Sequence, residues 1–170
     1  GDTWVMGLGC VGDLDGDGAE EIAITKPIQN VSVQDPFTGD INTRSGQGHV
    51  RIWQGGLLPD SSWAIEDFDT QIIGASEYDF IGRHLSNKID LNGDNKDDLV
   101  ISGTCYRSDG KNYNYCPGNN NYAYGGDTYL FYGGFPMGAT YSNLDADGFL
   151  EVYTGPMYSA GDTNGDGADD

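Results

Sequence analysis

The chain has 170 residues, a length that suits one domain or two small ones. Its 27 acidic and 8 basic residues give a formal net charge of −19, which would repel nucleic acid and anionic membranes. No apolar run approaches the roughly 18 residues of a membrane span, and no signal peptide is visible. We therefore expect no nucleic-acid partner and no membrane insertion. The abundance of Gly (27) and Tyr (11) favours a turn-rich β protein.

Acidic residues cluster in three short segments that resemble one another. GDLDGDGAEEIAI begins at Gly12, IDLNGDNKDDLVI begins at Ile89, and GDTNGDGADD begins at Gly161. The first aspartates of the first two segments, at positions 13 and 90, are 77 residues apart, and the third follows 72 residues later at position 162. Such self-similarity at a long, nearly constant period predicts a tandem array of structural units.

A second motif repeats in phase with the first. GHVRIWQGG spans residues 48–56, and GDTYLFYGG follows 78 residues later at 126–134. Residues 50–53 and 128–131 alternate as strands with one buried face, whereas 21–25 and 98–102 are short apolar runs typical of buried strands. Residues 30–44 and 107–126 are polar and are interpreted as insertions between strands. Units of this length, each with several strands, favour four-stranded propeller blades, with approximate units 1–56, 57–134 and an incomplete 135–170.

The acidic segments have the spacing of metal-binding loops. Oxygen-bearing side chains occupy positions 1, 3, 5 and 9 of each, and the carbonyl at position 7 completes the set. Such hard oxygen ligands favour Ca²⁺ over zinc or copper. Position 6 requires a positive φ, which suits Gly18 in the first loop and is tolerated by Asn95 in the second. The predicted ligands are Asp13, Asp15, Asp17, Ala19 and Glu21; Asp90, Asn92, Asp94, Lys96 and Asp98; and Asp162, Asn164, Asp166, Ala168 and Asp170, with Ala19, Lys96 and Ala168 contributing only carbonyls.

An EF-hand shares the first half of this pattern but requires a glutamate at position 12 and flanking helices. Position 12 is Ile24 in the first segment and Ile101 in the second, and strands follow. A nine-residue acidic loop that opens directly into a strand resembles the FG-GAP repeat of integrin α subunits. The Phe-Gly pair of that family is represented here by Met6-Gly7, Ile81-Gly82 and Thr154-Gly155, which keep the glycine and not the aromatic residue.

This resemblance covers nearly the whole chain. It implies an all-β fold of about two propeller blades and the start of a third, as part of a larger propeller or assembly. It also implies that each calcium loop joins two strands of a blade. We expect the calcium to be structural, because the carboxylates of each loop would otherwise repel one another. The first loop, with four carboxylates against three in the others, is expected to bind calcium most tightly.

Three further sites are predicted. Asn143, Asp145, Asp147 and Glu151 have the same 1-3-5-9 spacing and form a weaker, fourth metal candidate. Cys105 and Cys116 flank a Tyr/Asn/Gly-rich loop and are expected to form a disulfide, the alternative being two buried thiols; Cys10 is left free, buried or paired outside the chain. Asn30 begins an Asn-Val-Ser glycosylation sequon.

Neither histidine, His49 or His84, lies in a recognisable catalytic pattern, so we expect no enzyme activity. The favoured function is an extracellular calcium-binding module that mediates adhesion to a protein or glycan. The alternative is a structural subunit that assembles with copies of itself into a surface filament or stalk. An accessory propeller of a secreted enzyme is the third possibility.

Overall fold

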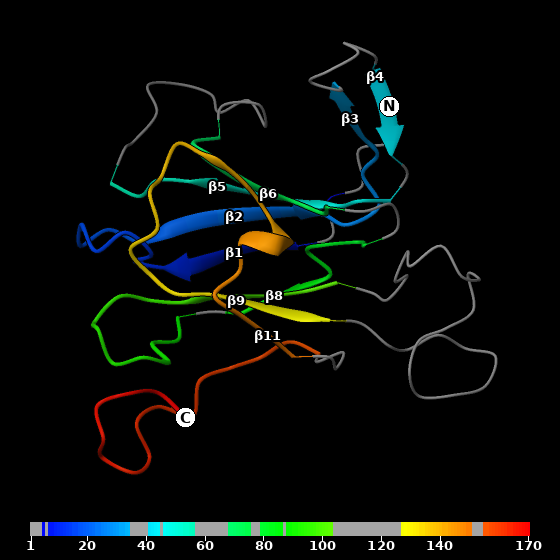
Figure 1. Ribbon diagram of the computed structural model, residues 1–170. Coiled ribbons are helices and arrows are strands. Elements are labelled where there is room, and N and C mark those ends of the chain that lie inside the picture. Colours follow the sequence, from blue (N-terminus) through cyan, green and yellow to red (C-terminus); the bar gives the residue numbers. More distant parts are fainter. Residues whose placement is uncertain are drawn as a thin grey trace, which may run out of the picture.

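The computed structural model describes residues 5, 7–34, 41–44, 46–56, 68–75, 79–86, 88–103, 127–150 and 155–170 (Figure 1). Over these residues the fold is all-β, with two main sheets and a separate two-stranded hairpin. Helical structure within the described ranges is limited to one 3-10 turn, η1 (Asn143–Asp145). The expected fold class is therefore confirmed at the level of an all-β protein.

The first sheet has the strand order β1-β2-β5-β6-β10. Its first four strands are antiparallel and follow the chain in order, whereas β10 joins β6 in parallel. The strands are β1 (Gly7–Gly12), β2 (Glu21–Lys26), β5 (His49–Trp53), β6 (Thr70–Ile73) and β10 (Thr140–Ser142).

The second sheet has the order β11-β9-β8-β7 and is antiparallel throughout. Its strands are β7 (His84–Leu85), β8 (Leu99–Ser102), β9 (Thr128–Phe131) and β11 (Gly148–Leu150). Chain order and pairing match those of β1, β2, β5 and β6 in the first sheet. The repeat in the sequence is thus a repeat of a four-stranded antiparallel unit.

The strands predicted around residues 21–25, 50–53, 98–102 and 128–131 are confirmed as β2, β5, β8 and β9, with boundaries shifted by no more than one residue. The insertion predicted at 30–44 contains a hairpin, in which β3 (Val31–Gln34) pairs with β4 (Ile41–Arg44). The insertion predicted at 107–126 lies outside the described residues.

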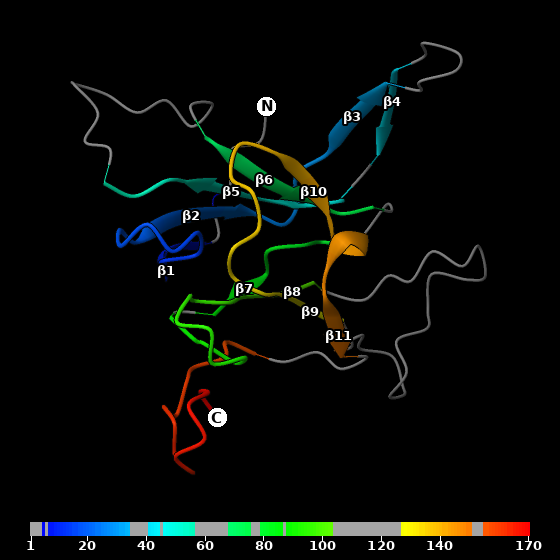
Figure 2. The ribbon, with the colours of Figure 1, turned by 60° about the vertical axis from the view of Figure 1, so that its left-hand side comes forward.

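The core lies between the two sheets, which are stacked one above the other in Figures 1 and 2. Burial alternates along β6 and along most of β2, as the period of two in a strand requires. All four residues of β8 are buried, so this strand is covered on both faces. The core cluster comprises Val11, Leu14, Ala23, Val50, Ile52, Ile72, Ile81, Leu99, Ile101 and Phe131.

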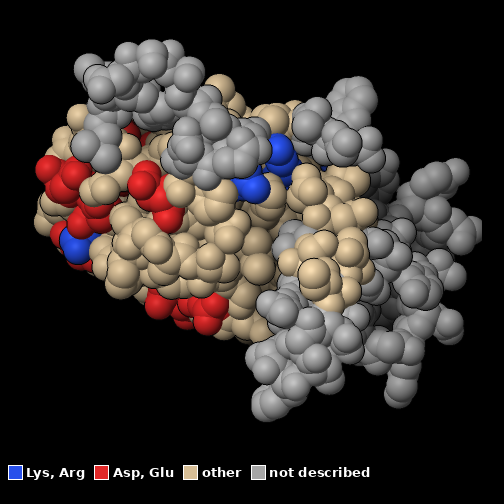
Figure 3. All heavy atoms as spheres, turned by 90° about the horizontal axis from the view of Figure 1, so that it is seen from above, with Lys and Arg blue, Asp and Glu red and all other residues tan. Residues whose placement is uncertain are grey.

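The three acidic loops lie along the same edge of the stacked sheets, at the left in Figure 1. The loop at 13–20 joins β1 to β2, and the loop at 90–98 joins β7 to β8. The third loop, 162–170, follows the second in the stack. Seen from above, many of the visible Asp and Glu side chains gather at this end (Figure 3). The fold therefore concentrates negative charge where the sequence predicts cations.

Candidate metal sites

The three acidic loops share one hydrogen-bond pattern. The carboxylate at position 1 accepts hydrogen bonds from the N–H groups of positions 4 and 6. The side-chain oxygens at positions 3 and 5 accept from the N–H groups two residues later, at 2.8–3.0 Å. The position-1 contacts are Asp13 with Gly16 and Gly18 (2.8 and 2.9 Å), Asp90 with Gly93 and Asn95 (2.7 and 2.8 Å), and Asp162 with Gly165 and Gly167 (2.6 and 2.9 Å).

Position 6 has the left-handed backbone expected from the sequence. Its φ angle is 92° at Gly18, 67° at Asn95 and 95° at Gly167. Asn95 is one of only three non-glycine residues with positive φ in the described part of the chain. The prediction that asparagine replaces glycine here without loss of the turn is confirmed.

The position-9 carboxylate of the first loop ties the loop to the Gly-Gly motif. Glu21 accepts the N–H of Leu14 through Oε2 at 2.6 Å and the N–H of Gly55 through Oε1 at 3.1 Å. A Cβ at Gly55 would lie 2.8 Å from the carbonyl carbon of Glu20, and closer still to its oxygen. Only glycine brings this N–H so close to the carboxylate.

The second loop repeats this arrangement. Asp98 accepts the N–H of Leu91 and the N–H of Gly133, each at 2.8 Å. A Cβ at Gly133 would lie 2.7 Å from the carbonyl oxygen of Asp97. The two motifs keep the same spacing along the sequence because the Gly-Gly turn of each unit binds the last carboxylate of its own acidic loop.

The position-9 residue of the third loop makes the corresponding loop contact. Asp170 accepts the N–H of Thr163, at position 2, at 3.0 Å. The hydroxyl of Thr163 also hydrogen-bonds to Asp170.

The carboxylates differ in burial and therefore in pKa. Glu21 and Asp98 are fully buried, and burial raises the pKa of both against the opposing effect of the N–H groups that they accept. Nearby loop carboxylates raise it further, Asp15 and Asp13 for Glu21, and Asp90 and Asp94 for Asp98. A cation in either loop would oppose both effects, because it favours the charged form.

The first loop brings its carboxylates closest together. Asp13, Asp15 and Glu21 each place one oxygen within 4.8 Å of the others, the only such group among the described residues. Gln54 adds an amide from the end of β5, with its Nε2 2.9 Å from Asp15 Oδ2 and 3.4 Å from Asp17 Oδ2. By donating to both, the amide holds these two carboxylates close to each other in the first loop.

The residues of all three loops fit a hard divalent cation. Each loop turns four oxygen-bearing side chains toward its own backbone N–H groups, and every expected metal ligand is a carboxylate, amide or carbonyl oxygen. The predicted carbonyl ligands belong to residues whose N–H groups are held by the position-5 side chains. These residues are Ala19, Lys96 and Ala168.

The fourth candidate does not form such a loop in its described residues. Asn143 is buried, and its Oδ1 accepts the N–H of Ala75 at 2.7 Å. Asp145 caps η1 by accepting the N–H of Ser142, and Asp147 accepts the N–H of Tyr132 at 2.8 Å. Each side chain thus binds a different backbone segment. Glu151 lies outside the described residues.

The remaining predicted residues are placed as follows. Cys105 and Cys116 lie outside the described residues, and Cys10 is free, with its Sγ 2.8 Å from Glu20 Oε2. Asn30 is exposed, and its Oδ1 accepts the N–H of Gly46 at 2.9 Å. Glycosylation of Asn30 stays a prediction.

His49 is buried at the start of β5 with 5% of its surface exposed. Burial, together with the neighbouring cations Arg51 and Lys26, lowers its pKa to about 4. His84, in β7, is half-buried, and burial also lowers its pKa.

No known protein family matches this sequence, and no characterised protein sequence matches it either. Within the described residues, no helix is long and apolar enough to cross a membrane.

Sequence reasoning missed several residues that act on these loops. Gln54 contacts two loop carboxylates from 37 and 39 residues away, and no periodic signal marks it, since its counterpart is Tyr132. Asp97 and Asp169 connect one loop to the next. The sequence does mark these two residues as equivalent, because each is an aspartate at position 8 of its loop.

Proposed function

We propose that this chain is an extracellular calcium-binding repeat module of the FG-GAP type, in which calcium is structural and the repeats present binding surfaces for a protein or glycan. The observation that carries the proposal is the common hydrogen-bond pattern of three acidic loops, two of which join the first and second strands of matching four-stranded units.

Ca²⁺ is the cation that fits best. Extracellular calcium sites with carboxylate and carbonyl ligands bind at roughly 10⁻⁴–10⁻³ M, an affinity that suits secreted fluid and not resting cytosol. A cation would offset the repulsion among side chains gathered at one end of a chain with a net charge of −19.

The propeller architecture is part of the proposal. Each complete unit is a four-stranded antiparallel sheet in chain order, and two such sheets stack face to face around a shared core. We interpret each such unit as a propeller blade, and closed propellers contain 4–8 blades. We infer that these units belong to a larger ring or assembly, and that their role is binding and not catalysis.

A filament or stalk subunit is the second candidate. It is favoured by the contact between adjacent acidic loops, which recurs with the same loop positions from the first loop to the second and from the second to the third. A contact that repeats without change is suited to an open array. Negative-stain imaging and size-exclusion chromatography discriminate the two functions: discrete particles support the binding module, and long fibres support the filament.

The calcium proposal is tested by thermal unfolding with calcium and with chelator. At about 10 mM calcium, a site with the affinity given above stabilises the folded state by about 1.4–2.7 kcal/mol. Asp15→Ala should remove the contribution of the first loop, so the stabilisation by calcium should fall by at least that amount. The same stabilisation by calcium in the wild type and in Asp15→Ala would contradict a structural role for the first site.

Asp145→Ala tests the fourth candidate in the same assay. Since Asp145 caps η1 by accepting the N–H of Ser142, the variant should lose some stability equally in calcium and in chelator. A loss seen only in calcium would indicate a metal site there.

A further inference from the structure

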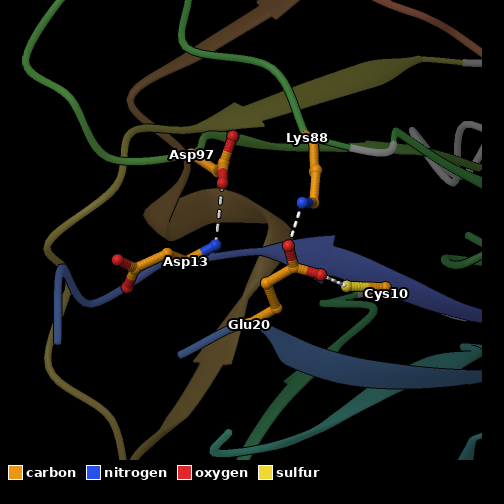
Figure 4. Close-up of polar contacts among 5 residues, drawn as sticks. All are labelled: Cys10, Asp13, Glu20, Lys88 and Asp97. Atoms are coloured by element: carbon orange, nitrogen blue, oxygen red, sulfur yellow. Dashed lines mark hydrogen bonds and ion pairs between the residues drawn. The ribbon is translucent and has the colours of Figure 1, made fainter. Parts of the chain in front are cut away.

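Adjacent acidic loops are joined by a reciprocal pair of hydrogen bonds. The N–H of Asp13 donates to Oδ2 of Asp97 at 2.8 Å (Figure 4), and the N–H of Asp97 donates to the carbonyl of Asp13 at 3.0 Å. Asp13 is the first residue of its loop, and Asp97 is the eighth residue of the next. The two residues are 84 positions apart in the chain.

The same pair recurs between the second and third loops. The N–H of Asp90 donates to Oδ2 of Asp169 at 3.2 Å, and the N–H of Asp169 donates to the carbonyl of Asp90 at 2.6 Å. Position 1 of each loop is thus held by position 8 of the loop that follows. Two independent occurrences make this a property of the repeat.

The fit around Asp97 is close. Gly12, just before the first loop, has φ of 93°, and a Cβ there would lie 2.5 Å from Cβ of Asp97 and closer to its carboxylate. The N–H of Gly134 also donates to the carbonyl of Leu14 at 2.6 Å, so the Gly-Gly turn of the second unit contacts the first loop as well. The first loop therefore has little freedom to move without the second.

The eighth residue of the first loop behaves differently. Glu20 accepts a hydrogen bond from Cys10 and forms an ion pair with Lys88, which precedes the second loop (Figure 4). The two side chains of the ion pair are exposed: 54% of the Lys88 side-chain surface and 48% of the Glu20 side-chain surface are accessible. An exposed ion pair contributes little, so the aspartate contacts are the ones that fix the loops relative to each other.

We propose that Asp97 and Asp169 are positioning residues that couple adjacent cation sites, so that filling one loop raises the affinity of its neighbour for Ca²⁺. This inference rests on the proposed function, since it takes the loops to be calcium sites. Asp97 precedes the ligand Asp98 directly and holds the backbone of the ligand Asp13. A cation that orders either loop therefore orders a ligand of the other.

Linkage makes this coupling reciprocal. If calcium in the first loop tightens the second, calcium in the second tightens the first by the same factor, typically about 5–150-fold. Direct electrostatics acts the other way, because a cation in one loop lowers the negative potential at the next. That repulsion is screened at an ionic strength of 0.15 M, where the Debye length is about 8 Å, whereas the hydrogen-bonded contact is not.

The test is calcium titration by isothermal calorimetry in 0.15 M salt, with the third loop silenced by Asp166→Ala. Adding Asp15→Ala to this variant silences the first loop as well, so the titration then gives the affinity of the second loop alone. We expect the two-loop protein to bind its second calcium about 5-fold or more tightly than the single loop does. Asp97→Ala should abolish this gain.

Two further variants separate positioning from charge and from misfolding. Asp97→Asn keeps the acceptor oxygen for the N–H of Asp13 and loses only the charge, so the gain should persist. Asp169→Ala makes the matched change at the other contact and should leave the coupling between the first two loops intact. Circular dichroism checks that each variant is folded.

Each outcome decides the question. If the two-loop protein binds its second calcium equally tightly with and without Asp97→Ala, the coupling is wrong, whereas the proposal of calcium sites is unaffected. Loss of the gain in Asp97→Asn as well as Asp97→Ala assigns the effect to charge and overturns the positioning role. Absence of calcium binding in the folded wild type overturns the proposed function and the coupling with it.

Discussion

The Gly55 turn offers the sharpest test of how each acidic loop is held to its sheet. The N–H of Gly55 donates to the buried carboxylate of Glu21 at 3.1 Å, and there is no room for a Cβ beside the carbonyl of Glu20. Gly55→Ala therefore has to move the turn away from the loop. Because the obstructing atoms belong to backbone, the clash cannot be relieved by a side-chain rotation.

The expected cost follows from two effects. A hydrogen bond to a charged group contributes about 1.5–3 kcal/mol, and the carboxylate left behind is fully buried. Together with the displacement of the backbone, we expect Gly55→Ala to lower the free energy of unfolding by about 2–4 kcal/mol. For a chain of this size, that corresponds to a fall in Tm of about 4–16 °C.

The assay is urea unfolding in excess calcium, with Gly155→Ala as the matched control. Among the described residues, no neighbouring atom lies within 4 Å of a Cβ built at Gly155, and its φ is not left-handed. The control should be neutral or stabilising by up to about 1 kcal/mol, because alanine restricts the unfolded chain. Gly133→Ala, at the equivalent turn of the second unit, should resemble Gly55→Ala. If Gly55→Ala unfolds at the same urea concentration as Gly155→Ala, the contact with Glu21 does not hold the loop.

Three other predictions concern single side chains. Gln54→Ala should weaken calcium binding by the first loop about 5-fold, the equivalent of one hydrogen bond of about 1 kcal/mol, and leave the other loops unchanged in calorimetry. For His49, burial and two neighbouring cations lower the pKa to about 4 in the folded state. Because the unfolded chain takes up a proton at higher pH, stability should fall by up to about 3 kcal/mol as pH drops from about 6.5 to about 4, and His49→Gln should remove this part of the pH dependence of urea unfolding. Asn143→Ala should cost about 1–3 kcal/mol in calcium and in chelator alike, since it leaves a backbone N–H without its acceptor; a loss confined to calcium would contradict that role.

The features that the sequence predicted well are local. The left-handed turn at Asn95 depends only on residues of its own loop. Strand β2, which begins at Glu21, was predicted from the short apolar run at 21–25. The phase shared by the acidic loops and the Gly-Gly motif indicated a repeat correctly. It did not reveal the reason for the shared phase, which is a hydrogen bond between residues 34 or 35 positions apart.

Contacts between residues far apart in the sequence were not predicted. The contact of Asp97 with Asp13 joins two units, and one sequence does not indicate which faces of two units meet. Strand β10 leaves the second unit to pair in parallel with β6 of the first, a crossover that no local pattern marks. The 143–151 segment shows the opposite error, because ligand spacing alone does not reveal that Asn143 is buried against the N–H of Ala75.

The carboxylates at the loop end fall into two groups, which we expect to depend on calcium to different extents. Glu21 and Asp98 are buried and accept two backbone N–H groups each, so they are satisfied by the fold itself. The carboxylates at positions 3 and 5 are partly or fully exposed and accept backbone N–H groups only from their own loop, as Asp15 and Asp94 do. Loss of a cation should therefore loosen the loop tips first, while the core between the sheets keeps its packing. Local opening of this kind requires less free energy than global unfolding, so hydrogen exchange in chelator should rise at the loops before it rises in β2 and β8.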